Sequence, residues 1–225
     1  MTSSRELRIQ VGERVGEVSA LLVRPEEAKW LLVLAHGAGA GMRHAFLETL
    51  ARELAAAGVA TLRYQFPYVE QGHRRPDPPG VLTATVRAAV RTAAEAAPDL
   101  PLLAGGKSLG GRMTSLAASE QPLEGVRGIV FFGFPLHPPK RPGTKRAEHL
   151  ARVTAPMLFL QGTRDTLADV NLLRLVCEQL GPRATLHVIE TADHSFRVLK
   201  RAGKSDAEVL RELAQTVTGW ATTLR

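Results

Sequence analysis

Two patterns of apolar and polar residues run along this sequence, and the change between them falls near residue 30. In the first pattern, Leu7, Ile9 and Val11 alternate with polar neighbours, as in a strand with one buried face. In the second, apolar residues form continuous runs, which is typical of parallel strands covered on both faces. We expect eight strands, over residues 5–11, 17–23, 31–35, 59–64, 100–104, 128–134, 156–160 and 184–189.

Helical spacing separates most of these strands. Leu47, Leu50 and Leu54 recur at intervals of three and four residues, and Ser205 with Glu208 forms a capping box that opens the last helix. Strands that alternate with helices indicate βαβ units. The pattern therefore predicts an α/β fold, a mostly parallel eight-stranded sheet with helices on both faces. The expected helices cover about 47–57, 81–97, 109–119 and 170–180, with a final one from 205.

A single domain is expected over residues 1–225, since no repeat or linker divides the chain. Hydrophobic residues make up 44% of it and charged residues 23%, a composition that excludes disordered and fibrous proteins. The one stretch that could form a lid, 135–155, is too short for a separate cap domain. We therefore expect an open site.

The sequence gives no indication of a membrane span. No apolar run approaches the roughly 20 residues that cross a bilayer, and no signal-peptide core follows the N-terminus. The single cysteine, Cys177, cannot form an internal disulfide and lies among apolar residues at helical spacing. We expect a buried cysteine in a cytoplasmic protein.

The chain carries a formal net charge of +7. Basic residues form local clusters, but no stacking aromatic residues are interleaved with them and no nucleic-acid motif contains them. The clusters are interpreted as solvated surface, and no specific nucleic-acid binding is expected. They comprise Arg74 and Arg75, then Lys140, Arg141, Lys145 and Arg146, and finally Arg197, Lys200, Arg201 and Lys204.

The strongest chemical signal is a G-x-S-x-G motif, from Gly106 through Ser108 to Gly110, between an expected strand and an expected helix. A serine on a sharp strand-to-helix turn needs neighbours without bulk two residues away on each side. The run Gly106-Lys107-Ser108 suggests a phosphate-binding loop of the pattern G-x-x-x-x-G-K-S. That pattern needs a second glycine five residues before Gly106, where Pro101 stands. The motif predicts Ser108 as a nucleophile.

A serine nucleophile needs a base, and the base needs a carboxylate to orient it. His194 follows the last expected strand and Asp165 follows the strand before it, so both should lie at the same sheet edge as Ser108. The order serine, aspartate, histidine is that of the α/β-hydrolase fold. Asp193 and Asp169 are rival candidates for the acid.

The glycine-rich loop from His36 to Gly41 is expected to supply part of an oxyanion hole. The two donors should be the backbone N–H groups of Ala38 and of Leu109, the residue after the nucleophile. The His36 side chain is expected to brace the loop. Candidate substrate-binding residues near this edge are Arg43 and His137, and Lys107 is expected to point away from Ser108.

These residues resemble a known group of enzymes. The runs H-G-A-G-A-G, G-G-K-S-L-G-G-R and G-T-R-D, with a late D-H, look like the compact α/β-hydrolases related to dienelactone hydrolase. More narrowly, residues 132–139 and 158–165 are similar to a largely uncharacterised family of predicted hydrolases, whose animal relatives include a testis-expressed protein and a subunit of a histone-acetyltransferase complex. The resemblance implies the fold and a triad of Ser108, Asp165 and His194. Dienelactone hydrolases use a cysteine nucleophile, so position 108 departs from them.

Together these features predict a serine hydrolase that cleaves a carboxylic ester or thioester of a small-molecule acyl substrate through an acyl-enzyme. Neither a metal ion nor a cofactor is expected. Two alternatives stay open from the sequence: a non-catalytic scaffold that keeps the fold, and acyl transfer to another acceptor by the same residues. The substrate and the oligomeric state are not determined by the sequence.

Overall fold

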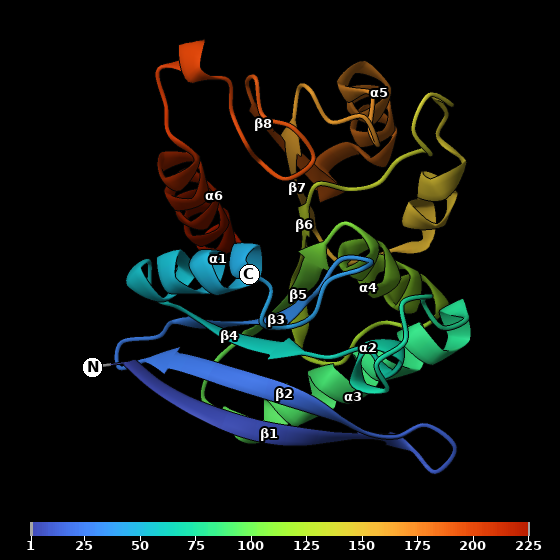
Figure 1. Ribbon diagram of the computed structural model, residues 1–225, viewed down its shortest axis with the longest axis vertical. Coiled ribbons are helices and arrows are strands. Elements are labelled where there is room, and N and C mark those ends of the chain that lie inside the picture. The colour runs from blue at the N-terminus through green and yellow to red at the C-terminus, as the bar shows by residue number, and fades with distance from the viewer. Residues whose placement is uncertain (1, 225) are drawn as a thin grey trace.

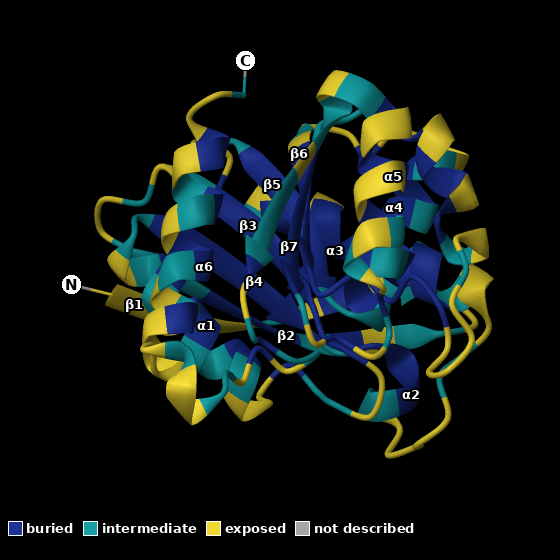
Figure 2. Ribbon diagram, turned by 90° about the horizontal axis from the view of Figure 1, so that it is seen from above, coloured by how far each residue is buried: buried dark blue, intermediate teal, exposed yellow. Residues whose placement is uncertain are grey.

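A computed structural model describes residues 2–224 as one eight-stranded sheet with helices on both faces (Figures 1 and 2). The expected α/β-hydrolase fold is confirmed. The strand order across the sheet is β1-β2-β4-β3-β5-β6-β7-β8. The strands are β1 (Thr2–Gly12), β2 (Gly16–Pro25), β3 (Trp30–Ala35), β4 (Val59–Tyr64), β5 (Leu102–Lys107), β6 (Val126–Phe132), β7 (Met157–Gly162) and β8 (Ala184–Ile189).

The sheet has an antiparallel edge and a parallel body. Strand β2 pairs antiparallel with both β1 and β4, whereas the pairs from β4 to β8 are all parallel. The change matches the two sequence patterns, because β1 is only partly buried on one face while β3 to β7 are buried almost throughout. In the parallel body, the carboxyl ends of the strands meet at one edge of the sheet.

The helices divide between the two faces of the sheet, with α1 and α6 on one and α3, α4 and α5 on the other (Figure 2). The capping box expected at the start of the last helix is present: the Ser205 hydroxyl accepts from Glu208 N, and the Glu208 carboxylate accepts from Ser205 N. The α-helices are α1 (Ala45–Ala56), α2 (Pro67–Glu70), α3 (Pro79–Ala96), α4 (Leu109–Glu120), α5 (Val170–Leu180) and α6 (Asp206–Ala221); the 3₁₀ helices are η1 (Lys145–Arg152), η2 (Gly181–Arg183) and η3 (Lys200–Ala202).

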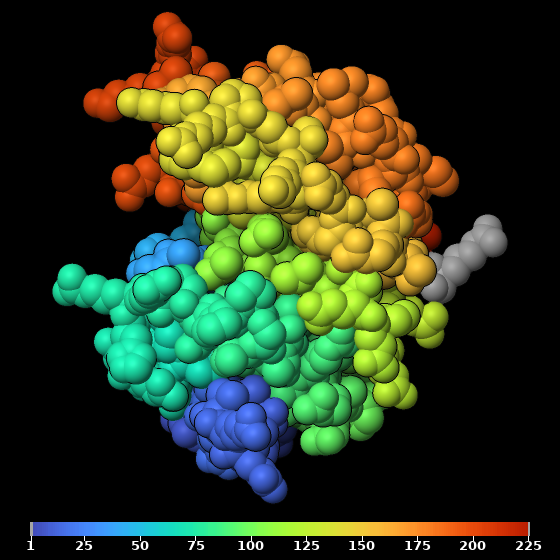
Figure 3. Space-filling model, turned by 90° about the vertical axis from the view of Figure 1, so that its right-hand side faces the viewer, coloured from blue at the N-terminus to red at the C-terminus, as the bar shows by residue number. Residues whose placement is uncertain are grey.

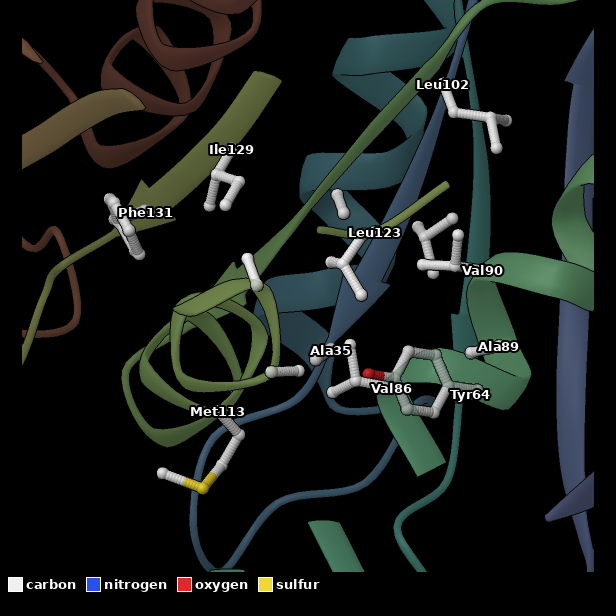
Figure 4. Packing of buried hydrophobic residues seen from close by; sticks show 14 of the residues in the cluster. Ala35, Tyr64, Val86, Ala89, Val90, Leu102, Met113, Leu123, Ile129 and Phe131 are labelled. Atoms are coloured by element: carbon white, nitrogen blue, oxygen red, sulfur yellow. The ribbon is translucent and has the colours of Figure 1, made fainter. Parts of the chain in front are cut away.

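Apolar side chains fill both spaces between the sheet and its helices. On the α3 and α4 side, Tyr64 of β4 packs near Val86 and Ala89 of α3, and Phe131 of β6 lies in the same cluster (Figure 4). Full burial of one such large side chain contributes about 1.5–3 kcal/mol to folding. Cys177 belongs to this cluster, as its spacing predicted. The two clusters fix the positions of the strands whose ends bear the candidate site residues.

Strand β5 runs further than the sequence pattern indicated, through two glycines to Lys107. We expected the strand to end at residue 104, and glycine is disfavoured inside strands. Gly105 is needed inside the sheet, since a Cβ there would collide with the carbonyl oxygen of Val130 on β6. The extension brings β5 directly to Ser108.

The stretch 135–155 folds against the same body rather than into a cap. It contains η1, whose buried Ala147 and Leu150 join the core on the α4 side. Figure 3 shows this stretch, in yellow, packed on the rest of the molecule. Among residues 2–224, no helix is long and apolar enough to cross a membrane.

Candidate active site

Ser108 occupies a strained turn between β5 and α4. Its φ of 50° and ψ of −115° are unusual for a residue with a side chain. The turn requires the two flanking glycines: a Cβ at Gly106 would lie 2.5 Å from the Ala35 carbonyl oxygen, and one at Gly110 would lie 2.6 Å from the His36 carbonyl oxygen. The strain and the close packing hold the serine hydroxyl at the sheet edge.

A chain of hydrogen bonds links Ser108, His194 and Asp165. His194 Nε2 lies 2.9 Å from Ser108 Oγ, and His194 Nδ1 lies 2.7 Å from Asp165 Oδ2. The three residues follow β5, β8 and β7, whose carboxyl ends share one edge of the sheet. The Asp165 side chain is 1% exposed, so water hardly competes for its bond to the imidazole. The geometry suits proton transfer from the hydroxyl to the imidazole.

Further hydrogen bonds fix the Asp165 carboxylate. Gln161 Nε2 donates to Oδ2 over 2.6 Å, and the backbone N–H of Leu167 donates to Oδ1 over 2.8 Å. The Gln161 oxygen in turn accepts from Phe134 N over 3.0 Å. Our sequence reasoning missed Gln161. The available signal was a polar residue inside the apolar run of β7, where it is fully buried.

The two rival carboxylates have other contacts. Asp193 Oδ1 accepts from the backbone N–H groups of Ser195 and Arg197, which shapes the loop around His194. Asp169 caps α5 by accepting from Asn171 N and Leu172 N. Of the three candidate carboxylates, Asp165 is the one hydrogen-bonded to His194 Nδ1.

The loop after β3 lines the same cavity as His194. Ala38 and Ser108 line the same cavity, and α4 begins at Leu109, so its first N–H groups have no partner within the helix. His36 braces this loop: its Nδ1 bonds to the Gly37 carbonyl over 2.8 Å, and its Nε2 accepts from Phe66 N over 3.0 Å. Burial lowers the pKa of His36 to about 4, which keeps the ring neutral.

The cavity beside Ser108 has a volume of about 620 Å³ and lies between the loop after β3, α1 and the loop of His194. It is lined by apolar side chains and by polar and charged ones. The apolar residues are Ala40, Ala45, Phe46, Leu47, Leu167, Phe196 and Leu210, and the polar ones include His44, Thr49, Ser195, Arg197 and Asp206. Such a site suits a ligand with an apolar body.

Two sequence-predicted substrate residues lie elsewhere. Arg43 pairs with Glu6 of β1 and lines a separate surface hollow. His137 accepts from Asp169 N through Nε2 and bonds to the Pro138 carbonyl through Nδ1, and it lines a second cavity together with Asp165 and Asp169. Lys107 lines the Ser108 cavity. Within residues 2–224, no cluster of three or more histidine, cysteine, aspartate or glutamate residues could hold a metal ion.

A second serine–histidine contact lies deeper in the molecule. Ser115 Oγ, in the middle of α4, is 2.8 Å from His149 Nε2 of η1 and also donates to the Arg112 carbonyl. Both residues are buried, and burial lowers the pKa of His149 to about 4. Neither residue lines the cavity beside Ser108. The contact joins η1 to α4.

Comparison with known proteins places the chain in a family. A dienelactone hydrolase from Anabaena variabilis ATCC 29413 is 26% identical with a TM-score of 0.77, over 100% of this chain and 99% of that one. An α/β serine hydrolase homologue from Coxiella burnetii is 20% identical with a TM-score of 0.75, over 95% and 96%. An α/β serine hydrolase without a lid from Xanthomonas campestris is 21% identical with a TM-score of 0.74, over 97% and 95%. The model of the alpha/beta hydrolase domain family matches residues 28–222, and the chain belongs to that family.

Proposed function

We propose that this protein is a serine hydrolase that cleaves a carboxylic ester or thioester through an acyl-enzyme, with residues 1–225 as one catalytic domain. The observation that carries the proposal is the hydrogen-bonded chain from Asp165 through His194 to Ser108. Its serine lies on a strained turn at the start of a helix and opens onto a cavity. The family supplies the fold, and the reaction is inferred from these side chains.

In the first half of the proposed reaction, His194 Nε2 takes the proton of Ser108, and Oγ forms a bond to the carbonyl carbon of the substrate. The negative charge moves to the carbonyl oxygen. The N–H groups of Ala38 and Leu109 are the proposed donors to that oxygen, supported by their place at the cavity and at the helix start. Asp165 keeps the imidazole in the tautomer that accepts at Nε2 and stabilises the imidazolium.

In the second half, the imidazolium gives its proton to the departing alkoxide or thiolate, and the carbonyl re-forms as an ester of Ser108. A water molecule then loses a proton to His194 and attacks this ester. Collapse of the second tetrahedral intermediate returns the proton to Ser108 and releases the carboxylic acid. Each half uses the same base, which fits the single histidine placed at the serine.

The proposed substrate is a small molecule with an apolar group near its ester or thioester. The apolar side chains that line the cavity support this proposal. Contact with them removes an apolar group of the substrate from water, which makes binding more favourable. The Xanthomonas campestris neighbour is described as lacking a lid, which fits an open site here too. Arg43 and His137 receive no substrate contact in this proposal. Membership of the narrower family with animal relatives stays a prediction.

The proposal is tested by intact-mass analysis after treatment with a fluorophosphonate, which reacts with serines that a base activates. We expect one adduct on the wild type, none on Ser108→Ala, and one on Ser115→Ala. The last variant is a matched control, since it removes the other serine that bonds to a histidine. A wild type that folds but gains no adduct would refute the catalytic assignment and favour a non-catalytic scaffold.

A further inference from the structure

The side chain of Lys107 ends in a buried ammonium beside the candidate triad. Its Nζ is shielded from solvent and has no hydrogen-bond partner among residues 2–224. It lies 5.9 Å from the ring centre of Phe46 and 5.8 Å from that of Phe196. The two rings are stacked against each other, with centres 5.9 Å apart. Two aromatic faces stabilise a cation only in part, so this buried charge requires an explanation.

The ammonium and the imidazole of His194 lie against the same glycine. A Cβ at Gly133 would be 3.2 Å from Lys107 Nζ and 3.5 Å from both Nδ1 and Cε1 of His194. The lysine stem passes the loop after β3 on its way, since a Cβ at Gly37 would lie 3.7 Å from Lys107 Cγ. The side chain therefore runs from one side of Ser108 to the edge of the proposed base.

The charged groups around the ammonium have opposing effects on it. Burial lowers the pKa of Lys107 to about 8, while the carboxylates of Asp165 and Asp193 act in the opposite direction. At neutral pH the lysine is therefore mostly protonated. The other titratable groups that line this cavity are His194 itself and three exposed residues, namely His44, Arg197 and Asp206.

We infer that Lys107 is a positioning residue for His194: its ammonium opposes protonation of the imidazole and so keeps the base free at lower pH. The inference rests on the proposed function, in which His194 accepts the serine proton. Asp165 favours the imidazolium through its contact at Nδ1, and Lys107 opposes it from its place beside the imidazole against Gly133. Since the ammonium is buried, salt screens its effect on the imidazole weakly.

The test reads His194 directly, by NMR of protein labelled at histidine Cε1, with the resonance assigned from His194→Gln. In Lys107→Met, which keeps an unbranched side chain one atom shorter and removes the charge, we expect the titration midpoint of His194 to rise by about one pH unit. Lys107→Arg should restore a midpoint within about 0.3 unit of the wild type. Lys29→Met removes one exposed charge just before β3, at the opposite edge of the sheet, and should leave the midpoint unchanged.

A midpoint in Lys107→Met within about 0.3 unit of the wild type would overturn the inference and leave Lys107 a packing residue. If that variant does not fold, the titration of His194 in the wild type tests the same inference. Its His194 resonance should show a second, smaller inflection near pH 8 as Lys107 loses its proton, and a curve without it would overturn the inference. The titration needs no substrate, so a failure of the proposed function, seen as a missing fluorophosphonate adduct, is distinguished from a failure of this inference.

Discussion

Two serine–histidine hydrogen bonds of nearly equal length lie along α4 and the turn before it, but their surroundings differ. Ser108 Oγ is 2.9 Å from His194, and Ser115 Oγ is 2.8 Å from His149. The first serine has a strained backbone, and its histidine bonds to a buried carboxylate. The second serine lies inside a regular helix and gives its hydroxyl to the Arg112 carbonyl.

A short contact between serine and histidine is therefore not enough to propose a nucleophile. Access to a cavity, free N–H groups at a helix start and a carboxylate behind the imidazole all occur at Ser108. Among residues 2–224, the contacts of Ser115 include none of these features and instead hold η1 on α4. The first pair is therefore proposed to react and the second to stabilise the fold.

The largest expected effect comes from Ser108→Ala. We expect turnover of a chromogenic ester such as p-nitrophenyl acetate to fall by at least about 10⁴-fold, with only catalysis by binding and backbone donors left. Steady-state kinetics of wild type and variant measure this, and circular dichroism checks that the variant folds. A fall of less than tenfold would show that another group is the nucleophile.

The carboxylate behind His194 gives the next effect. In Asp165→Asn the uncharged amide no longer favours the required tautomer, so we expect kcat to fall by roughly 10³–10⁴-fold while the fold persists. Asp169→Asn is a matched control, because Asp169 caps α5 and should affect stability rather than kcat. Full activity in Asp165→Asn would refute the choice of acid.

The sequence was informative where a residue's role follows from its place at a strand end. Ser108, Asp165 and His194 each follow a strand of the parallel body, so their convergence could be predicted from topology alone. The two glycines around Ser108 could be predicted as well, since their need is local and steric.

Contacts between distant segments could not be predicted in the same way. Arg43 pairs with Glu6 of β1, a strand that no local pattern places beside it. Strand β5 continues through Gly105, where β6 lies too close for a side chain. This close approach exists only once the sheet is packed, so the local sequence does not reveal it. The course of Lys107 toward Gly133 likewise follows from the packing of Phe46 and Phe196.

The pH dependence of stability sharpens the comparison further. Burial lowers the pKa of His149 from an ordinary value of about 6.5 to about 4, so between these values the unfolded chain binds a proton that the folded protein does not. The free energy of unfolding should therefore fall as the pH drops from about 6.5 to about 4. His36, which is buried with a similar pKa, acts in the same direction.

His149→Gln should remove roughly 2 kcal/mol of this pH-dependent loss while keeping turnover at pH 7. Urea unfolding at pH 4.5 and pH 7 measures the difference, with the exposed His73→Gln as the control. An unchanged difference between the two pH values would mean that His149 is not held neutral by burial.

The smallest effect is expected from Ser115→Ala. This change removes the hydroxyl that bonds to His149 and leaves Nε2 of that ring without its partner in a buried place. We expect the free energy of unfolding to drop by about 1–2 kcal/mol, the cost of one unsatisfied buried group, with kcat and fluorophosphonate labelling unchanged. Urea unfolding and ester kinetics on the same preparation separate the two properties. A folded variant that lost tenfold or more in kcat would place the second pair in the chemistry, and the contrast between the two serines would then not hold.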